Sequence, residues 1–255
     1  MKVVIIGGTG LIGRSVAASL RQIGHEVLTA SPSSGVNSVT GEGLDAALQG
    51  ADVLIDSSNS PSFDDEAVMN FFRSSTGNLI ASARLANIRH YIAVSVVGTD
   101  RLLESGYFRA KDVQEGLIKQ SGVPFTIVRA TQFFEFVGAI AYTATDGNSV
   151  RLSSAGIQPI SAADVSKAIA NIALERPRHS IVEIAGPEVF KLTDLVQLHL
   201  EKTGDYREVV TDNTARYFGA TLHDDTLLPG SGALIAGTRF EEWLNEQQVK
   251  FTGAA

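Results

Sequence analysis

The residues best suited to chemistry in this sequence are Tyr107 and Lys111, which are four positions apart. The segment that begins at Ser105 is predicted to start a helix, with Ser105 as its cap, and residues four apart on a helix project from the same face. A phenol, with a pKa near 10, exchanges a proton poorly at neutral pH unless its anion is stabilised. An ammonium group about 4 Å away contributes at most about 4 kcal/mol at an effective dielectric constant of about 20. The spacing therefore indicates that Tyr107 is a proton donor assisted by Lys111.

A third candidate, Ser95, lies near the end of the predicted strand His90 to Gly98. Its hydroxyl would hold a substrate carbonyl while a hydride arrives and Tyr107 gives the proton. A tyrosine four residues before a lysine is common by chance, so a packed tyrosine with a surface lysine is the alternative interpretation. The catalytic assignment of Tyr107, Lys111 and Ser95 therefore depends on a cofactor site elsewhere in the chain.

The opening stretch of the sequence predicts that cofactor site. The apolar run Val3 to Ile6 has the length of a buried parallel strand, and it leads through a glycine turn into an amphipathic helix. Gly7 permits the tight turn, Gly10 lets a diphosphate approach the backbone, and Gly13 lets the helix pack close to the strand. The N–H groups of the first helical turn then hold the phosphates, so the alternative of a turn that binds nothing leaves four glycines unexplained. The predicted cofactor contacts in this stretch are Gly7, Thr9, Gly10, Leu11, Ile12, Gly13 and Arg14.

The segment after the second predicted strand, His25 to Ala30, bears on the choice of cofactor. An acidic residue about 20 positions after the glycines grips the adenosine ribose of NAD, but here the segment holds hydroxyls and no carboxylate. Ser31, Ser33 and Ser34 are compatible with a 2′-phosphate, and Arg14 is close enough in sequence to reach the same group. We therefore expect NADP(H) to be favoured over NAD(H); the alternative is that the serines only form a turn and that Arg14 is a solvated helix residue.

Two further loops follow predicted strands on the ligand side of the sheet. Ser57, Ser58 and Asn59 follow the strand Asp52 to Asp56 and are expected to lie along the dinucleotide. Thr131 and Gln132, after the strand Phe125 to Arg129, are also predicted to bind the cofactor. The aromatic residues that come next are Phe133, Phe134 and Phe136. They suit an apolar or aromatic substrate beside the nicotinamide; the alternative is that they belong to the hydrophobic core.

The composition agrees with an enzyme of this kind. The chain has 255 residues, of which 44% are hydrophobic, and no cysteine, so disulfides and thiolate sites are excluded. A net charge of −7 argues against nucleic acid as a partner, and no stretch approaches the roughly 20 apolar residues of a membrane span. The scattered histidines predict no metal site, and the expected location is cytoplasmic. The sequence leaves open whether the protein is a monomer or a homodimer.

The glycine fingerprint and the tyrosine–lysine pair resemble the short-chain dehydrogenase/reductase superfamily. More narrowly, the chain is similar to its atypical, NmrA-like NAD(P)H-binding branch in three segments: residues 106–111, 124–134 and 158–165. The resemblance implies an α/β fold with a Rossmann-type doubly wound parallel sheet and a small C-terminal subdomain on the substrate side. Residues 1–150 would form the NAD(P)-binding domain, and residues 151–255 would complete the sheet and form a small cap. Ser95 is one position closer to Tyr107 than in the commonest members, and no asparagine falls clearly at their fourth catalytic position.

Hydrophobic spacing predicts several details of the helices. Asp64 to Asn87 is a long helical region that Gly77 interrupts, with Leu85 on its buried side. Thr193 is predicted to cap a helix from Asp194 to Thr203, and the last helix, from Arg239 to Gln248, to pack Phe240, Trp243 and Leu244. The first helix is expected to direct five apolar residues inward: Leu11, Ile12, Val16, Leu20 and Ile23.

Three functions are compatible with these residues. The first is an NADP(H)-dependent oxidoreductase that reduces a small apolar carbonyl or quinone by hydride transfer. The second is a non-catalytic, NADP(H)-sensing regulator of the NmrA-like type, although a sensor has no need of a proton donor. The third is a sugar-nucleotide epimerase or dehydratase, for which the chain is short because such enzymes carry a lid domain.

Overall fold

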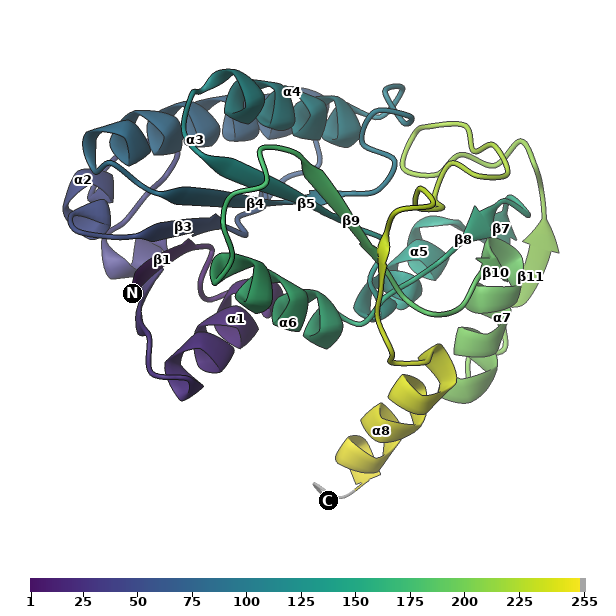
Figure 1. Ribbon diagram of the computed structural model, residues 1–255. Helices are drawn as coiled ribbons and strands as arrows, with labels where there is room; N and C mark the ends of the chain where they lie inside the picture. Colours follow the sequence, from purple (N-terminus) through teal and green to yellow (C-terminus); the bar gives the residue numbers. More distant parts are fainter. Residues whose placement is uncertain (253–255) are drawn as a thin grey trace.

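The computed structural model describes residues 1–252 and is built around a seven-stranded sheet (Figure 1). Its strands run in the order β12-β9-β5-β4-β3-β1-β2, and every neighbouring pair is parallel. Parallel strands need crossover connections, which here are mostly helices. The bounds of the strands are β1 Lys2–Ile6, β2 Glu26–Ala30, β3 Val53–Asp56, β4 His90–Val96, β5 Phe125–Ala130, β9 Ile181–Ala185 and β12 Leu234–Ile235.

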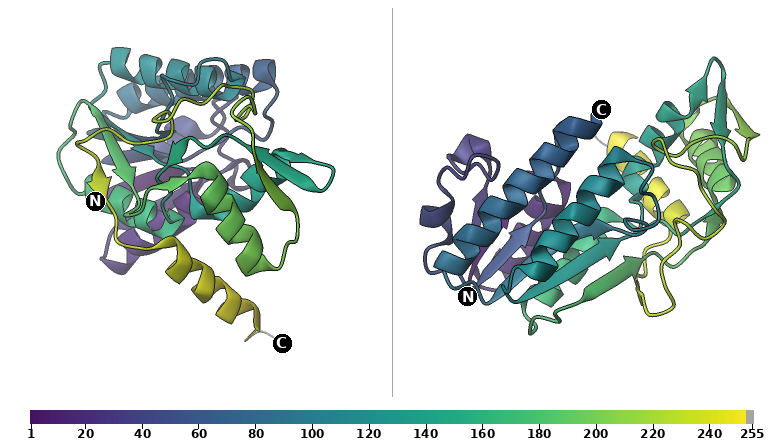
Figure 2. Two further views of the ribbon diagram at one scale, coloured as in Figure 1. Left: turned by 90° about the vertical axis from the view of Figure 1, so that its right-hand side faces the viewer. Right: turned by 90° about the horizontal axis from the view of Figure 1, so that it is seen from above.

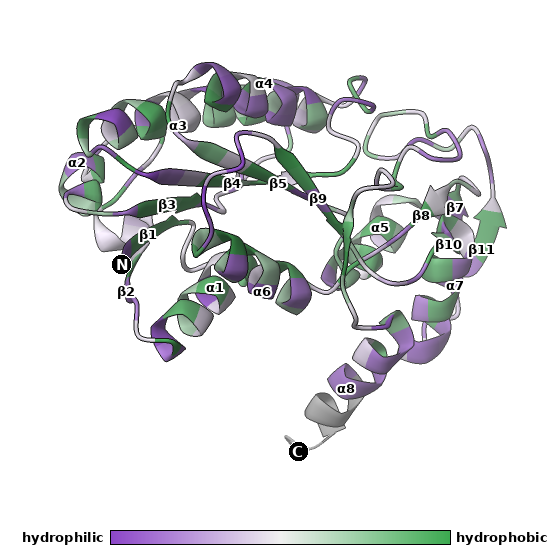
Figure 3. Ribbon diagram, in the orientation of Figure 1, coloured by the Kyte–Doolittle hydropathy of each residue, from purple (hydrophilic) through white to green (hydrophobic). Residues whose placement is uncertain are grey.

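Helices cover both faces of this sheet, because alternate residues of each strand point to opposite faces. Val3 and Ile5 of β1 pack toward α1 and α6, whereas Val4 and Ile6 pack toward α2, α3 and α4. The long helices α3 and α4 lie side by side on one face (Figure 2, right), and strands β1, β3 and β9 are mainly apolar (Figure 3). The helices are α1 Leu11–Gln22, α2 Leu44–Leu48, α3 Asp65–Leu85, α4 Gly106–Gln120 and α6 Ala162–Ala173.

A second hydrophobic cluster lies beside the carboxyl end of the sheet. It joins Phe108 and Phe134 from the first part of the chain to Leu195, Phe240 and Leu244 from the last part. The elements around it are the 3₁₀ helix η2 Phe134–Phe136, α5 Val137–Thr143, β6 Thr145–Asp146, β7 Ser149–Leu152, β8 Gly156–Ile157, β10 Phe190–Lys191, α7 Leu192–Thr203, β11 Glu208–Thr211 and α8 Phe240–Thr252. Residues 253–255, the end of the predicted second part, lie outside the described residues.

The order of the strands reverses at β1, which has β2 on one side and β3 on the other. Ligands of open α/β sheets bind outside the carboxyl ends of the strands at such a switch point. The turn after β1 and the loop after β3 meet there, since a Cβ atom on Gly7 would lie 2.8 Å from the carbonyl oxygen of Ser57. The fold therefore gathers the predicted cofactor segments at one edge.

Several predicted details of the helices are wrong. Gly77 does not interrupt α3, and Leu85 at its end is 73% exposed. Leu11 and Ile23, at the two ends of α1, are also exposed, because the buried stripe of this helix runs only from Ile12 to Leu20. The helix near position 193 begins at Leu192 with Lys191 as its cap, so Thr193 is already helical.

Candidate cofactor and active site

The glycine turn leaves backbone donors unused at the start of α1. Gly7 has φ +73°, and a Cβ atom on Gly13 would lie 2.7 Å from the Cα atom of Gly8 and closer still to the Gly7 carbonyl oxygen. Only glycine at position 13 therefore lets α1 begin against the turn. Within residues 1–252, no protein group accepts a hydrogen bond from the amides of Leu11, Ile12 or Gly13. Three free amides at a helix N-terminus fit the phosphates of a dinucleotide.

The serines after β2 bond mainly to one another. They form the 3₁₀ helix η1 Pro32–Ser34, in which the Ser31 amide donates to Ser34 Oγ at 2.9 Å. Ser31 Oγ and Ser33 Oγ lie 2.8 Å apart, and Ser34 Oγ donates to the Ser31 carbonyl oxygen. Arg14 is exposed on the second turn of α1. The three serine hydroxyls thus already bond within this turn, and a 2′-phosphate would have to compete with those bonds.

The loop after β3 is anchored by its first two residues, Ser57 and Ser58. Ser57 Oγ donates to the Ile6 carbonyl oxygen at 3.0 Å, which ties this loop to the end of β1. Ser58 bonds through its amide and its hydroxyl to the Asp56 carboxylate. Asn59 is exposed and accepts from the Ser60 amide. The loop is therefore held beside the glycine turn, as expected of a segment that lines a dinucleotide.

Tyr107 and Lys111 lie on the face of α4 that is turned toward α3. Both contact Phe72: the ring centroids of Tyr107 and Phe72 are 6.1 Å apart, and Lys111 Nζ lies 4.4 Å from the Phe72 ring. Lys111 is buried, and its ammonium group donates to the Val94 carbonyl oxygen at 2.8 Å and to Gln114 Oε1. The helical spacing thus gives the common face predicted from the sequence, but the ammonium group bonds to partners inside the protein.

Burial controls the proton affinities of the pair. Burial raises the pKa of Tyr107 to about 12, and a hydrogen bond with Asn59 opposes the rise. Burial lowers the pKa of Lys111 to about 8, against the attraction of Asp56 and Glu115. Lys111 is not among the groups that shift the pKa of Tyr107. At neutral pH the phenol therefore keeps its proton and suits a donor better than a base.

Ser95 belongs to a different buried network. Its hydroxyl donates to Glu115 Oε1 at 2.7 Å, and the same carboxylate receives two hydrogen bonds of 2.8 Å from Arg129. Arg129 also pairs with Asp100 at 3.0 Å. These contacts fix β4 and β5 to α4, and they direct the Ser95 hydroxyl toward Glu115.

Thr131 and Gln132, directly after β5, carry buried polar atoms without a partner. Within residues 1–252, neither the Thr131 hydroxyl nor either polar atom of the Gln132 amide has a hydrogen bond. Gln132 is 8% exposed. A buried amide without partners is costly, so these two side chains are suited to receive a ligand at the end of the strand.

The aromatic residues near the site divide between core and surface. Phe134 is core, packed against both Phe240 and Trp243, while Phe136 is exposed and stacks on Phe133 with centroids 5.6 Å apart. The prediction that all three phenylalanines line a pocket is therefore wrong for Phe134, because the last helix covers it.

Other aromatic side chains, which sequence reasoning missed, surround Tyr107. Phe63, in the loop before α3, is 63% exposed and lies 5.6 Å from the Tyr107 ring. Tyr217 comes from the C-terminal part, and its pKa is raised by burial and by the neighbouring Tyr107. Asp56 and Gln114, which bond to each other at 3.0 Å, were also missed. Gln114 had a usable signal, because it lies one turn after Lys111.

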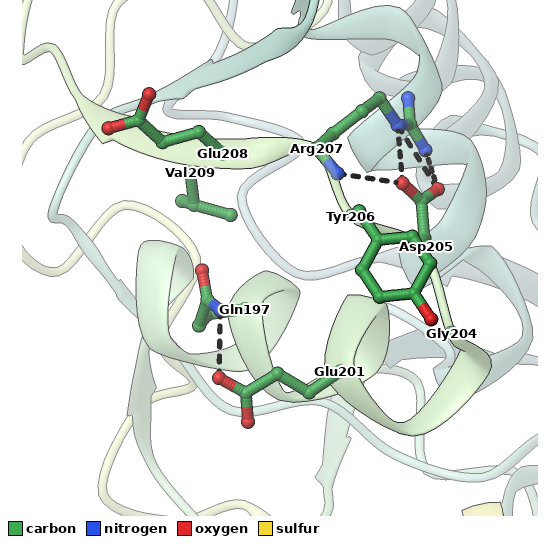
Figure 4. A pocket seen from close by; sticks show the side chains of 8 residues that line it. All are labelled: Gln197, Glu201, Gly204, Asp205, Tyr206, Arg207, Glu208 and Val209. Carbon is green, nitrogen blue, oxygen red and sulfur yellow. Dashed lines mark hydrogen bonds and ion pairs between the residues drawn. The ribbon is translucent and has the colours of Figure 1, made fainter.

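Elsewhere the described part of the chain offers weaker sites. A cavity of about 460 Å³ lies between α7 and β11, where Arg207 pairs with Asp205 and Gln197 bonds to Glu201 (Figure 4). Arg207 and Asp205 thus neutralise each other within the lining, and Glu201 accepts from Gln197. Among residues 1–252 there is no cluster of histidine and acidic side chains that would hold a metal, and none of the helices combines the length and apolar composition that a membrane crossing requires.

Comparisons with known proteins agree with this geometry. The sequence profile of the NAD(P)H-binding family matches residues 7–176. Photosystem II assembly factor Ycf39 of Cyanophora paradoxa is 25% identical over 227 residues, which cover 82% of this chain and 71% of that protein.

Two solved structures have a similar fold. NADPH-dependent quinone oxidoreductase QOR2 of Escherichia coli, complexed with NADPH, gives a TM-score of 0.70 at 19% identity and covers 96% of this chain and 99% of its own. UDP-glucose 4-epimerase of Thermotoga maritima gives a TM-score of 0.77 at 15% identity, with 100% and 99% covered. These likenesses confirm the predicted doubly wound α/β fold.

Proposed function

The chain belongs to the NAD(P)H-binding family, and from this premise we propose that it is an NADP(H)-dependent oxidoreductase that reduces a small apolar carbonyl or quinone. The observation that carries the proposal is the set of free amides of Leu11, Ile12 and Gly13, at a helix start that requires glycine at position 13. Such a turn binds a pyrophosphate and so fixes where the nicotinamide must lie.

The chemistry divides between the cofactor and Tyr107. Bound NADPH would supply the hydride and leave as NADP⁺. Tyr107 would donate its phenolic proton to the oxygen of the reduced substrate and regain a proton from solvent. The raised pKa of Tyr107 keeps that proton in place until negative charge develops on the substrate oxygen. We assign Lys111 a role in holding the nicotinamide ribose, which requires it to exchange one of its present partners.

The preference for NADP(H) is part of the proposal. No carboxylate lies among residues 31–34 to repel a 2′-phosphate, and Arg14 is an exposed cation near the start of the adjoining helix. Ser31, Ser33 and Ser34 would add hydroxyl contacts by giving up part of their mutual bonding. The remaining contacts that we propose for the cofactor are those of Gly7, Thr9, Gly10, Ser57, Ser58, Asn59, Thr131 and Gln132.

The surroundings of Tyr107 favour a flat, apolar substrate. Phe63 offers an exposed ring beside the phenol, and Tyr217 approaches it from the C-terminal part. An aromatic wall of this kind suits a quinone, the substrate class in the name of the Escherichia coli structure.

A second candidate is a non-catalytic NADP(H)-sensing regulator. It is favoured by the bonding of Lys111 to Val94 and Gln114, and of Ser95 to Glu115, because neither polar group is free to meet a substrate. The name of the Cyanophora relative, an assembly factor, points in the same direction.

Two measurements on the purified protein distinguish these functions. Calorimetry with NADPH and NADH tests the binding site, and we expect binding with a preference for NADPH. NADPH oxidation is then followed with a panel of quinones and aldehydes. Turnover supports the oxidoreductase, binding without turnover supports the sensor, and absence of binding to either dinucleotide refutes both.

A further inference from the structure

Asp56, the last residue of β3, is a buried carboxylate with donors on both of its oxygens. The residue is 1% exposed. Oδ1 accepts from the Ser58 amide at 3.0 Å and from the Ser58 hydroxyl at 2.6 Å. Oδ2 accepts from Gln114 Nε2 at 3.0 Å and from the Tyr91 hydroxyl at 3.3 Å. Each oxygen therefore faces a different part of the molecule.

Gln114 links the Asp56 carboxylate to the Lys111 ammonium group. Its amide nitrogen donates to Asp56, and its amide oxygen accepts from the Lys111 ammonium group. Gln114 and Lys111 are both buried on α4, so no solvent competes for these bonds. One hydrogen-bonded chain thus runs from Ser58, beside the glycine turn, to Lys111, one helical turn after Tyr107.

We propose that Asp56 is a positioning residue that couples the dinucleotide loop, Ser57 to Asn59, to the Tyr107–Lys111 face of α4. This inference rests on the proposed function, because it assumes that NADP(H) contacts that loop. A ligand that holds Ser58 in place also holds the Asp56 carboxylate, the Gln114 amide and the ammonium group behind it. Because coupling is reciprocal, a change at Lys111 must alter the affinity of the loop for the dinucleotide.

The geometry explains why an amide cannot replace the carboxylate. In Asp56→Asn, the NH₂ group meets either the two Ser58 donors or the Gln114 donor. If Gln114 turns its amide to accept from the new NH₂ group, its own NH₂ group then faces the Lys111 ammonium. With the NH₂ group toward Ser58, the hydroxyl can turn to accept from it, but the Ser58 amide then loses its acceptor. Every orientation therefore leaves at least one hydrogen bond of this network unmade.

The first experiment compares Asp56→Asn with Tyr91→Phe in the full chain by calorimetry with NADPH. Tyr91→Phe is the matched control, because it removes a donor from the same carboxylate but leaves the Ser58 and Gln114 hydrogen bonds to that carboxylate in place. We expect Asp56→Asn to raise the dissociation constant about tenfold, the effect of one charge-assisted hydrogen bond. The control is expected to stay within about twofold, since its bond is long and lies outside the chain.

The second experiment is a double-mutant cycle of Ser58→Ala and Gln114→Leu, read as the NADPH dissociation constant. If Asp56 couples the loop to α4, the Gln114 substitution already loosens the carboxylate. The increase in the NADPH dissociation constant caused by Ser58→Ala is then at least about threefold smaller in the Gln114→Leu background than in the wild type. Affinity is measured on protein whose urea midpoint shows that it is folded, so a purely structural role of Asp56 does not produce this result. The cycle also remains valid if Asp56→Asn itself does not fold.

The outcomes separate this inference from the proposed function. If the wild type binds no dinucleotide, the proposed function fails. If the wild type binds NADPH but the two substitutions act independently, with combined effects that multiply to within about twofold, the coupling role of Asp56 is refuted and the proposed function stands. Binding is the readout, so the test applies equally to an enzyme and to a sensor.

Discussion

The replacement of Gly13 by alanine tests the glycine turn most directly. Alanine is the better helix former, and in an open helical position this change stabilises a protein by up to about 1 kcal/mol. At position 13, however, the new methyl group would lie 2.7 Å from the Gly8 Cα atom and 2.8 Å from Ser57 Oγ, with the Gly7 carbonyl oxygen closer still. Two of these three neighbours are backbone atoms, so α1 must move away from the turn. Overpacking of this kind costs about 1–3 kcal/mol.

The matched control is Gly77→Ala, within α3, where an added Cβ meets no atom within 4 Å. Both substitutions share the gain in helix propensity, so their difference in unfolding free energy isolates the steric cost, which we expect to be about 1–3 kcal/mol. The two variants are compared by urea unfolding and by calorimetry with NADPH. We expect Gly13→Ala to lose at least about tenfold in affinity, because the displaced amides no longer converge on the phosphates. Equal stabilisation by both substitutions, with unchanged affinity, would refute the assignment of the turn as the phosphate site.

Other predictions concern the charged and polar groups of the site. Tyr107→Phe should lower kcat by about 10²–10⁴-fold in NADPH oxidation with a quinone while leaving NADPH affinity nearly unchanged; equal losses in both would contradict its role as proton donor. Arg14→Ala should weaken NADPH binding about tenfold and leave NADH binding unchanged, and a parallel loss for both dinucleotides would argue against a 2′-phosphate contact. Burial lowers the pKa of Lys111 from 10.5 to about 8. Between these two pKa values the unfolded chain therefore binds more protons at this residue than the folded chain does. The contribution of Lys111 to the unfolding free energy should rise with pH by about 3 kcal/mol across this range. Lys111→Met should remove this rise in urea unfolding; a profile that matches the wild type would show that the lysine is not buried as described. Glu115→Ala should lower the unfolding free energy by about 3–5 kcal/mol, because it removes one of the two carboxylates that pair with the buried Arg129 and leaves Asp100. A decrease of less than about 1 kcal/mol in urea unfolding would count against this network.

Local signals predicted the parts of the fold that depend on near neighbours in the chain. The strand and helix around the glycine turn appear where the apolar run and the glycines placed them, and the resemblance to the atypical short-chain dehydrogenase/reductase branch is confirmed. Helix ends were less predictable, because Leu85 and Ile23 have apolar side chains at positions that no other element covers.

The candidate site could be predicted only in part. The spacing of Tyr107 and Lys111 gave their shared helix face, which follows from helix geometry alone. It could not show that the ammonium group bonds to Val94, or that Glu115 accepts from the Ser95 hydroxyl, because both contacts join α4 to β4. Gln114 lies on α4 itself, and helical spacing places it near Lys111 without showing that its amide also reaches Asp56. Phe134 was equally ambiguous, since only the position of the last helix makes it core.

The sequence alone determined the glycine turn, the parallel sheet and the helical spacing of the tyrosine and lysine, because backbone conformation and periodicity act over a few residues. The tertiary structure decided what those side chains meet. Asp56 lies 58 positions before Gln114 and 35 before Tyr91, yet it bonds to both. Burial among such distant partners sets the hydrogen bonds and the pKa values of the site, and no local pattern contains that information.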